Sequence, residues 1–225
     1  MAGRRSLTAN EERRLLRVAR KLNPRDRALL TAQWMTGFRI SEILSLTVGA
    51  VYRHGAVVEK IGVAPKHLKG HYGRTRWVPV LPELHCALST WINTMARRWE
   101  LTPDLPLFLS RKSEVDGTAR SVDRDTARRM MHAAFARAHI VNDGRLGTHT
   151  QRKTWSRHVF KNSGFNIMVL KAALNHSQLT STQRYLEVEE DAVVAAIKKC
   201  DFTRRTKAER KIQASGEIVP AARAA

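Results

Sequence analysis

Apolar residues recur at helical spacing near the start of the chain. In LTANEERRLLRVARKL, residues 7 to 22, Leu15, Val18 and Leu22 lie three or four positions apart, on one face of a helix. Thr8 and Glu11 stand at its start as a capping box, and an Asn-Pro pair follows its end. The pattern therefore predicts a helix with one buried face.

Two further helices follow in the same region. RDRALLTAQWMTG is apolar on most sides, which indicates a buried helix, and Gly37 has the position of its C′ residue. FRISEILSLTV then predicts a third helix, with Ser41 placed to cap it.

The pattern next changes from helical to extended. GAVVEKIGV and RTRWVPV are short and rich in β-branched residues, and they flank APKHLKGHYG, which holds two Gly and a Pro. These features predict a small antiparallel sheet with a long basic tip.

Helical patterns return after the sheet, with a surface connection at residues 100 to 121 whose short run LPLFLS is buried. The predicted helices cover residues 84–98, 122–139, 149–162, 166–174 and 180–198. The fold class is thus mainly α with one small antiparallel β-sheet. Residues 1–202 form a single domain, and residues 203–225 form a basic, Ala-rich tail that is mobile or docks on a partner.

Charge narrows the choice of partner. The chain has forty Lys and Arg and twenty Asp and Glu, a formal net charge of +20. Repulsion among the positive side chains destabilises the folded state unless a polyanion neutralises them. Double-stranded DNA or RNA is the leading partner, and an anionic membrane surface is the alternative. The chain has no apolar run long enough to span a bilayer and no apolar signal core, so we expect a cytoplasmic protein that does not insert into a membrane.

Metal and nucleotide sites have little support. Cys86 and Cys200 show no CxxC pairing, and neither GxxxxGK[ST] nor HExxH occurs. We therefore expect no metal and no cofactor.

Cations gather in THTQRKTWSRHVF, residues 148 to 160. Thr148 and Gln151 have capping-box spacing, so the helix is expected to begin at His149. His149 and Arg152 then share a face in its first turn, where free N–H groups and the helix dipole favour an anion. A phosphate bound there would explain the cations, although a solvated basic helix end would also do so.

Other segments carry reactive side chains. Arg39 lies in the turn of TGFRISEILSL, and Glu42 follows three residues later. LNHSQLTSTQRYLEV places His176 in a polar turn before Tyr185, and HLKGHYGRTRWVPV places Lys69 at the hairpin tip. Each has a plainer explanation when taken alone: an ion pair of Arg39 with Glu42, a turn residue, or a half-buried aromatic.

Together these segments resemble the tyrosine recombinases, the phage integrase family. Its boxes resemble TGLRISELLSL, HxLRHTFAT and LGHSSISTTQRYxH, and here they read TGFRISEILSL, HTQRKTWSR and LNHSQLTSTQRYLEV, in the same order with the basic hairpin between the first two. The resemblance covers roughly residues 7 to 200, the catalytic domain. Gln151, Lys153 and Asn175 depart from the family's Leu, His and Gly, and none of these changes removes a group that the reaction needs.

The resemblance implies a role for each matching residue. Arg39 and Arg152 would bind the scissile phosphate, Tyr185 would be the nucleophile, and His149 would assist proton transfer. His176 would hydrogen-bond a phosphate oxygen, and Glu42 would support the site.

The hairpin lysine is the least fixed of these assignments. The family's lysine commonly lies eight residues before the strand proline, here Pro79, and that count reaches His71 rather than Lys69. A longer hairpin would restore Lys69 as the acid that protonates the leaving 5′-oxygen, and Lys66 is the alternative. The basic side chains expected to contact DNA phosphates are Lys66, Arg74 and Lys153.

The implied activity is site-specific DNA strand exchange through a 3′-phosphotyrosyl intermediate and a Holliday junction, by a homo-tetramer on two recombination sites, with possible accessory directionality proteins. The setting would be a bacterial nucleoid, with the gene on a chromosome, phage or plasmid. The N-terminal core-binding domain of the family has no counterpart here, so the chain is a short form or a truncated one. A non-catalytic DNA-binding relative and a type IB topoisomerase-like relaxing enzyme are the alternatives.

Overall fold

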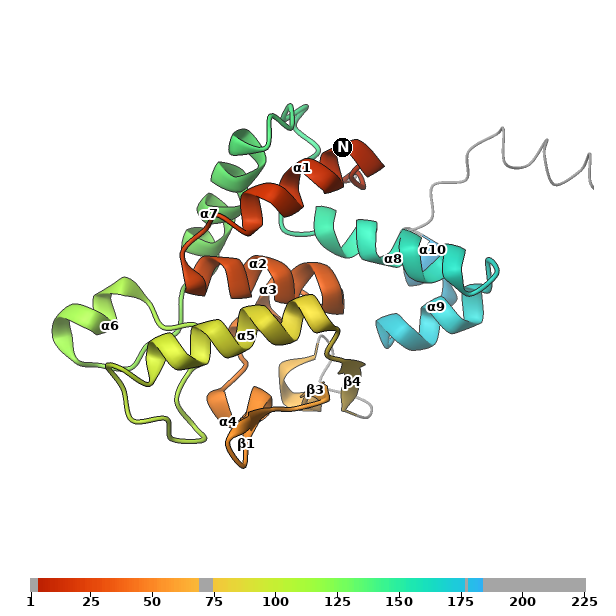
Figure 1. Ribbon diagram of the computed structural model, residues 1–225. Coiled ribbons are helices and arrows are strands. Elements are labelled where there is room, and N and C mark those ends of the chain that lie inside the picture. Colours follow the sequence, from red (N-terminus) through yellow and green to blue (C-terminus); the bar gives the residue numbers. More distant parts are fainter. Residues whose placement is uncertain (1–3, 69–74, 177, 184–225) are drawn as a thin grey trace, which may run out of the picture. The chain divides into compact units, whose positions relative to one another are not determined.

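The computed structural model describes residues 4–68, 75–176 and 178–183, all within one compact unit, Met1–Leu186 (Figure 1). In chain order its elements are α1 Ala9–Ala19, α2 Pro24–Thr36, α3 Ile40–Leu44, α4 Val48–Val51, β1 Tyr52–Arg53, β2 Ala56–Val57, β3 Lys60–Val63, the 3-10 helix η1 Pro65–His67, β4 Arg76–Pro79, α5 Pro82–Met95, α6 Arg111–Asp116, α7 Arg124–Arg137, α8 Thr150–Asn162, α9 Ile167–Leu174 and α10 Leu179–Gln183. The predicted class, mainly helical with a small antiparallel β component, is confirmed.

Helix α2 lies at the centre of the core. It packs against α5 on one side and α8 on another, and α1 also contacts it (Figure 1). Its residues are buried on most sides, including Leu29, Leu30 and the polar Gln33. The predicted burial of this helix is therefore confirmed.

Helix caps fix where α1 and α2 begin and end. The predicted capping box is present, since the Thr8 side chain accepts from the Glu11 N–H and the Glu11 carboxylate accepts from the Thr8 N–H. Helix α2 ends at Gly37, which has the left-handed conformation with φ of 58°. The predicted C′ glycine is therefore confirmed, and it sets the direction of the chain as it leaves the core.

The β component is two separate two-stranded antiparallel sheets rather than one. β3 pairs with β4 as predicted, with Val63 opposite Arg76, and residues 69–74 of the tip lie outside the described residues. β1 and β2 form a second hairpin whose turn residues, His54 and Gly55, both have positive φ. Such a turn matches the twist of a two-residue hairpin. The segment GAVVEKIGV, predicted as one strand, is divided between β2 and β3, which belong to different sheets.

Four local predictions are wrong. Arg39, not Ser41, is the N-cap of α3, and the predicted third helix is interrupted between α3 and α4. His149, not Thr148, caps α8. The surface connection contains a helix, α6, which ends at Gly117 in the left-handed conformation. Its apolar run is buried as predicted, through Leu105, Leu107, Phe108 and Leu109.

Only residues 179–183 of the predicted helix at 180–198 are described, and the predicted domain limit at residue 202 and the tail lie outside the described residues. In the described part of the chain, no helix is both long and apolar enough to cross a lipid bilayer.

Candidate active site

Arg39 lies where the chain leaves α2 and starts α3. Its backbone N–H donates to the Glu42 carboxylate at 2.8 Å, and its Nη1 donates to the other carboxylate oxygen at 2.6 Å. Glu42 is fully buried, whereas the Arg39 side chain is 21% exposed. The carboxylate therefore holds the guanidinium in place while part of that group still faces solvent.

Arg152, in the first turn of α8, points toward the same carboxylate. Its side chain is fully buried, and its Nη1 lies 3.7 Å from Glu42 Oε2. Nη1 also donates to the carbonyl of Gly37 at 2.6 Å, and Nη2 donates to that of Leu174 at 3.2 Å. One guanidinium thus joins the ends of α2 and α9, and it shares Glu42 with Arg39.

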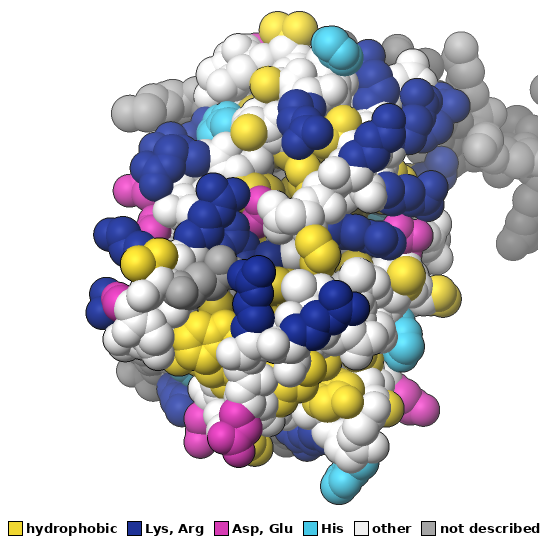
Figure 2. Space-filling view, turned by 60° about the vertical axis from the view of Figure 1, so that its left-hand side comes forward, with side chains coloured by type: hydrophobic (Ala, Val, Ile, Leu, Met, Phe, Trp, Pro, Cys, Tyr) yellow, Lys and Arg dark blue, Asp and Glu magenta, His cyan; other side chains and the backbone are white. Residues whose placement is uncertain are grey.

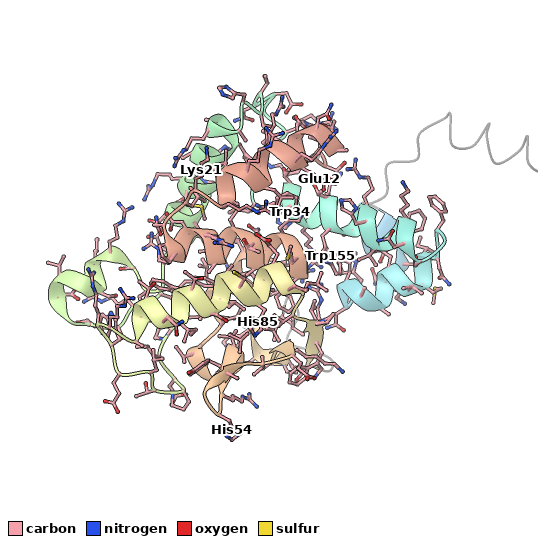
Figure 3. All side chains as sticks on the ribbon, in the orientation of Figure 1. Glu12, Lys21, Trp34, His54, His85 and Trp155 are labelled. Atoms are coloured by element: carbon pink, nitrogen blue, oxygen red, sulfur yellow. The ribbon has the colours of Figure 1, made fainter. Side chains whose placement is uncertain are left out.

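Gly37 is essential to this arrangement. A Cβ at this position would lie 2.4 Å from Cε3 of Trp155, so no side chain fits without moving the indole. The indole itself is held by a hydrogen bond from Nε1 to the carbonyl of Met35 at 3.0 Å, and Figure 3 shows Trp155 between α8 and α2. The carbonyl end of a helix favours cations. At the end of α2, the carbonyl of Gly37 accepts the hydrogen bond from Arg152.

A third arginine, Arg76 on β4, completes the cluster and is buried. Its Nη1 lies 3.6 Å from Glu42, and Nη2 donates to the carbonyl of Thr36 at 2.8 Å. Its guanidinium lies over the rings of Phe38 and Trp155, at 4.6 and 5.3 Å from their centroids.

Sequence reasoning missed Arg76. In the same segment we predicted that Arg74 contacts a DNA phosphate, and Arg74 lies outside the described residues. The signal was available in the alternation of the strand, because Arg76 and Val78 share the buried face of β4 and Trp77 points to solvent.

His176 follows α9 and contacts Arg152 directly. The Arg152 Nη2 lies 3.2 Å from His176 Nε2, and a guanidinium can only donate, so Nε2 carries no proton. The proton is then on Nδ1, which donates to Thr182 Oγ1 at 3.1 Å. Burial, followed by the charges of Arg152, Arg39 and Arg76, lowers the pKa of His176 to about 4.

His149 stands at the N-cap of α8, where the structure records no side-chain cap for the first turn. The free N–H groups of such a turn and the helix dipole attract an anion. Although the residue reaches solvent, removal of water by the surrounding protein and the nearby charges of Arg152 and Arg39 lower the pKa of His149. The lowered pKa keeps the imidazole neutral at neutral pH, so one ring nitrogen has a lone pair available to accept a hydrogen bond or a proton.

The cluster is strongly positive. The guanidinium groups of Arg39, Arg76 and Arg152 all lie within 4 Å of a single carboxylate, that of Glu42. Glu42 can compensate only part of this charge. An anion such as a phosphodiester would supply the rest.

The structure brings together five of the predicted residues: Arg39, Glu42, His149, Arg152 and His176. Lys66 is exposed in η1, and Lys153 is half-buried on α8. Lys69, Arg74 and Tyr185, as well as the alternative His71, lie outside the described residues.

The N-terminal segment supports α8 in a way that the sequence did not predict. The Leu7 N–H donates to Thr154 Oγ1 at 2.9 Å, and Glu12 pairs with Arg157 at 2.8 Å and with His158 at 2.6 Å. Figure 3 shows Glu12 on the side of α1 that faces α8. Arg4 donates to two carbonyls of the loop that leads to His149. These contacts fix the start of α8 relative to α1.

Known proteins with similar sequences are recombinases. The tyrosine recombinase XerC of Rhodospirillum centenum is 29% identical over 171 residues, which are 76% of this chain and 45% of the relative. The tyrosine recombinase XerD of Haemophilus ducreyi is 27% identical over 188 residues, 81% of this chain and 58% of the relative. The chain thus spans about half the length of the curated relatives it matches.

Solved structures share the fold. The crystal structure of XerA recombinase has a TM-score of 0.69 at 21% identity and covers 89% of this chain and 68% of its own. The integrase of transposon Tn1549, in complex with transposon right end DNA, has a TM-score of 0.64 at 17% identity and covers 88% and 67%. The sequence profile of the phage integrase family matches residues 5–191, and the chain belongs to that family.

Proposed function

We propose that the protein is a site-specific DNA recombinase that cuts and rejoins DNA without a metal or nucleotide. The observation that carries this proposal is the meeting of Arg39 and Arg152 at Glu42, beside His149 and His176. The names of the relatives and the DNA in the Tn1549 integrase structure support the same conclusion.

The two arginines bind the non-bridging oxygens of the scissile phosphate. Their planar forks suit two oxygens better than a lysine would, and they stabilise the charge that develops in the transition state. His176 hydrogen-bonds one of the same oxygens. From Nε2, that contact requires the other tautomer, in which Nδ1 accepts from Thr182 Oγ1 and the hydrogen bond from Arg152 to Nε2 is lost.

Tyr185 attacks the phosphorus and His149 takes the phenolic proton. The bond between phosphorus and the 5′-oxygen breaks, and Lys69 protonates the leaving oxygen, with Lys66 as the alternative donor. The product is a 3′-phosphotyrosyl link and a free 5′-hydroxyl. A 5′-hydroxyl from another strand reverses these steps, so the energy of the phosphodiester is retained and no cofactor is consumed. Arg74 and Lys153 contact neighbouring phosphates.

Strand exchange requires more than one protomer. We propose a homo-tetramer on two DNA sites that passes through a Holliday junction, in the cytoplasm of a bacterium and with accessory proteins where direction matters. Residues 1–202 act as the catalytic domain and residues 203–225 dock on a neighbouring protomer. Deletion of residues 201–225 should therefore weaken assembly while leaving cleavage by single protomers intact.

A nicked suicide substrate, which loses the strand needed for rejoining, tests the chemistry. The parent protein should accumulate a covalent protein–DNA adduct, and Tyr185→Phe should abolish the adduct while DNA binding changes little. Tyr52→Phe, on β1, is the control and should trap normally. An adduct that persists in Tyr185→Phe would refute the assignment. Relaxation of supercoiled plasmid without site preference would identify a topoisomerase instead.

A further inference from the structure

A basic groove runs between α1 and α7, and its lining shares no residue with the arginine cluster. A cavity of about 780 Å³ lies between the α1–α2 connection, the segment around α6, and one face of α7. A second cavity, of about 220 Å³, continues it along α1 and shares Lys21 and Arg137 with the first. We call the two cavities together the α1–α7 groove.

Positive side chains dominate this groove. Nine Lys and Arg line it, namely Arg14, Arg17, Lys21, Arg25, Arg111, Lys112, Arg120, Arg129 and Arg137. Figure 2, which brings forward the side of the molecule bearing α6 and α7, shows dark-blue side chains across this face, and Figure 3 places Lys21 beside α7.

The two carboxylates that line the groove already have local partners. Asp26 accepts from Arg25 at 2.8 Å and from Asn23. Asp123 caps α7 by accepting from Thr126. Of the lining cations, Arg120 also pairs with Asp116 at 3.1 Å, outside the lining. The excess positive charge that is left in the groove is self-repulsive, and a bound polyanion would relieve that repulsion.

The dimensions and the chemistry of the groove suit an extended polyanion. From Thr126 to Arg137, the lining face of α7 rises about 17 Å, several times the ~3.4 Å rise of one nucleotide along a strand of duplex DNA. Among the residues that the structure describes, the lining contains no Phe, Tyr or Trp on which a nucleotide base could stack, and His139 in the second cavity is its one aromatic ring. A row of cations that lacks a pocket for a base binds successive phosphates along a strand rather than one nucleotide.

The groove begins close to the candidate active site. Ser121, in its lining, donates to the carbonyl of Leu44 at 2.8 Å, and Leu44 is the last residue of the short helix that Arg39 caps. That helix has five residues and is about 7.5 Å long. A strand bound at Arg39 could therefore continue into the groove within a few phosphates.

We propose that the α1–α7 groove binds the sugar-phosphate backbone of duplex DNA beyond the cleavage site. This inference rests on the proposed function only for the identity of the polyanion. The groove adds affinity through released counterions and adds no base recognition. It lengthens the DNA segment that one protomer holds.

Charge reversal in the groove tests this inference. The variant Lys21→Glu with Arg137→Glu changes two exposed side chains that line both cavities. The matched control is Arg97→Glu with Lys161→Glu, which makes the same change in charge at exposed positions elsewhere. Circular dichroism checks folding, and Lys21→Gln with Arg137→Gln replaces the reversal if that variant unfolds.

Binding is measured over a range of salt concentrations with two duplexes, one ending a few base pairs past the cleavage position and one extending well beyond it. The groove variant should lose at least about tenfold in affinity for the long duplex, and the slope of log K against log salt should fall by about two. Affinity for the short duplex should follow that of the control.

Equal losses in both variants, equal losses on both duplexes, or an unchanged slope would overturn the inference. Covalent trapping at saturating DNA and low salt should survive in the groove variant. If the groove inference alone fails, Tyr185-dependent trapping remains. If the proposed function fails, trapping is absent in the parent protein whatever the groove does.

Discussion

The Nη2 of Arg152 lies 3.2 Å from the Nε2 of His176, and this contact exists only while the imidazole is neutral. Protonation would place a second cation against a buried guanidinium. The lowered pKa of His176, about 4, has this origin together with the burial of the ring. Because protonation of His176 would break this contact, the arrangement of the arginine cluster depends on pH.

Stability should fall in mildly acidic solution. An unfolded histidine takes up its proton near pH 6.5, whereas folded His176 does so only near pH 4. The unfolded chain binds more protons between these values, so the free energy of unfolding should decrease as the pH is lowered from about 6.5 to 4. Urea titrations across this range should show a shallower decrease for His176→Gln. A decrease as steep as in the parent protein would contradict the prediction; His85→Gln, an exposed histidine of α5, is the control.

Glu42→Gln should destabilise the fold strongly. The substitution leaves Arg39, Arg76 and Arg152 close together without their shared carboxylate, and breaking a buried ion pair in this way costs about 3–5 kcal/mol. Glu83→Gln breaks partly exposed pairs with Arg20 and Arg27 and should cost much less, about 1 kcal/mol. Equal effects of the two substitutions on denaturant-induced unfolding would argue against the central role of Glu42.

Arg152→Lys should reduce cleavage with little effect on DNA binding. A lysine cannot donate to the carbonyls of Gly37 and Leu174 and present a planar fork to a phosphate as well. Single-turnover cleavage should slow by about 10²–10³. The control is Arg157→Lys on the same helix, which should cleave at nearly the parent rate because a lysine can keep the ion pair with Glu12 of α1. A comparable loss in both variants would indicate damage to α8 rather than to catalysis.

Gly37→Ala should affect stability and cleavage together. The left-handed conformation alone costs a non-glycine residue about 1–2 kcal/mol, and the added Cβ would collide with Trp155. Gly117→Ala is a matched control, since its φ is 71° and the space around it is open. Thermal unfolding should show a larger loss at position 37, and only that variant should lose cleavage. Similar losses at both positions would show that the conformation alone sets the cost.

Gln151→Leu should stabilise the protein. Gln151 is fully buried, and neither atom of its amide has a hydrogen-bond partner in the structure, which describes residues 4–68, 75–176 and 178–183. A buried polar group without a partner costs about 1–3 kcal/mol, so an apolar residue of similar size should raise the free energy of unfolding. Gln33→Leu should have the opposite effect, because Gln33 donates to the carbonyl of Thr148 at 2.7 Å. Destabilisation by Gln151→Leu would point to a partner for the amide.

The sequence was informative where one residue type has one physical role. Thr8 with Glu11 and Gly37 predicted helix ends correctly. The meeting of Arg39, Arg152 and His176 was an expectation from the resemblance to the family. The resemblance to the family supplied the meaning of those residues, since composition indicated only a polyanion.

The sequence was less informative where a side chain bonds to a distant main-chain atom. Arg76 donates to the carbonyls of Thr36 and Ala173, and no spacing along the chain announces such contacts. The choice between Ser41 and Arg39 as a cap failed for a related reason. Glu42 caps α3 from inside the helix by accepting from the Arg39 N–H, so the cap residue itself needs no acceptor side chain.

Two arginines of the cluster, Arg76 and Arg152, are anchored largely by peptide oxygens, those of Thr36, Gly37, Ala173 and Leu174. Every amino acid offers that oxygen, so evolution is free to exchange the residues at positions 36, 173 and 174 within the limits of packing. Gly37 alone is restricted, by its conformation and by the indole above it. Distant relatives could thus preserve the anchoring of the arginines while their sequences diverge around it.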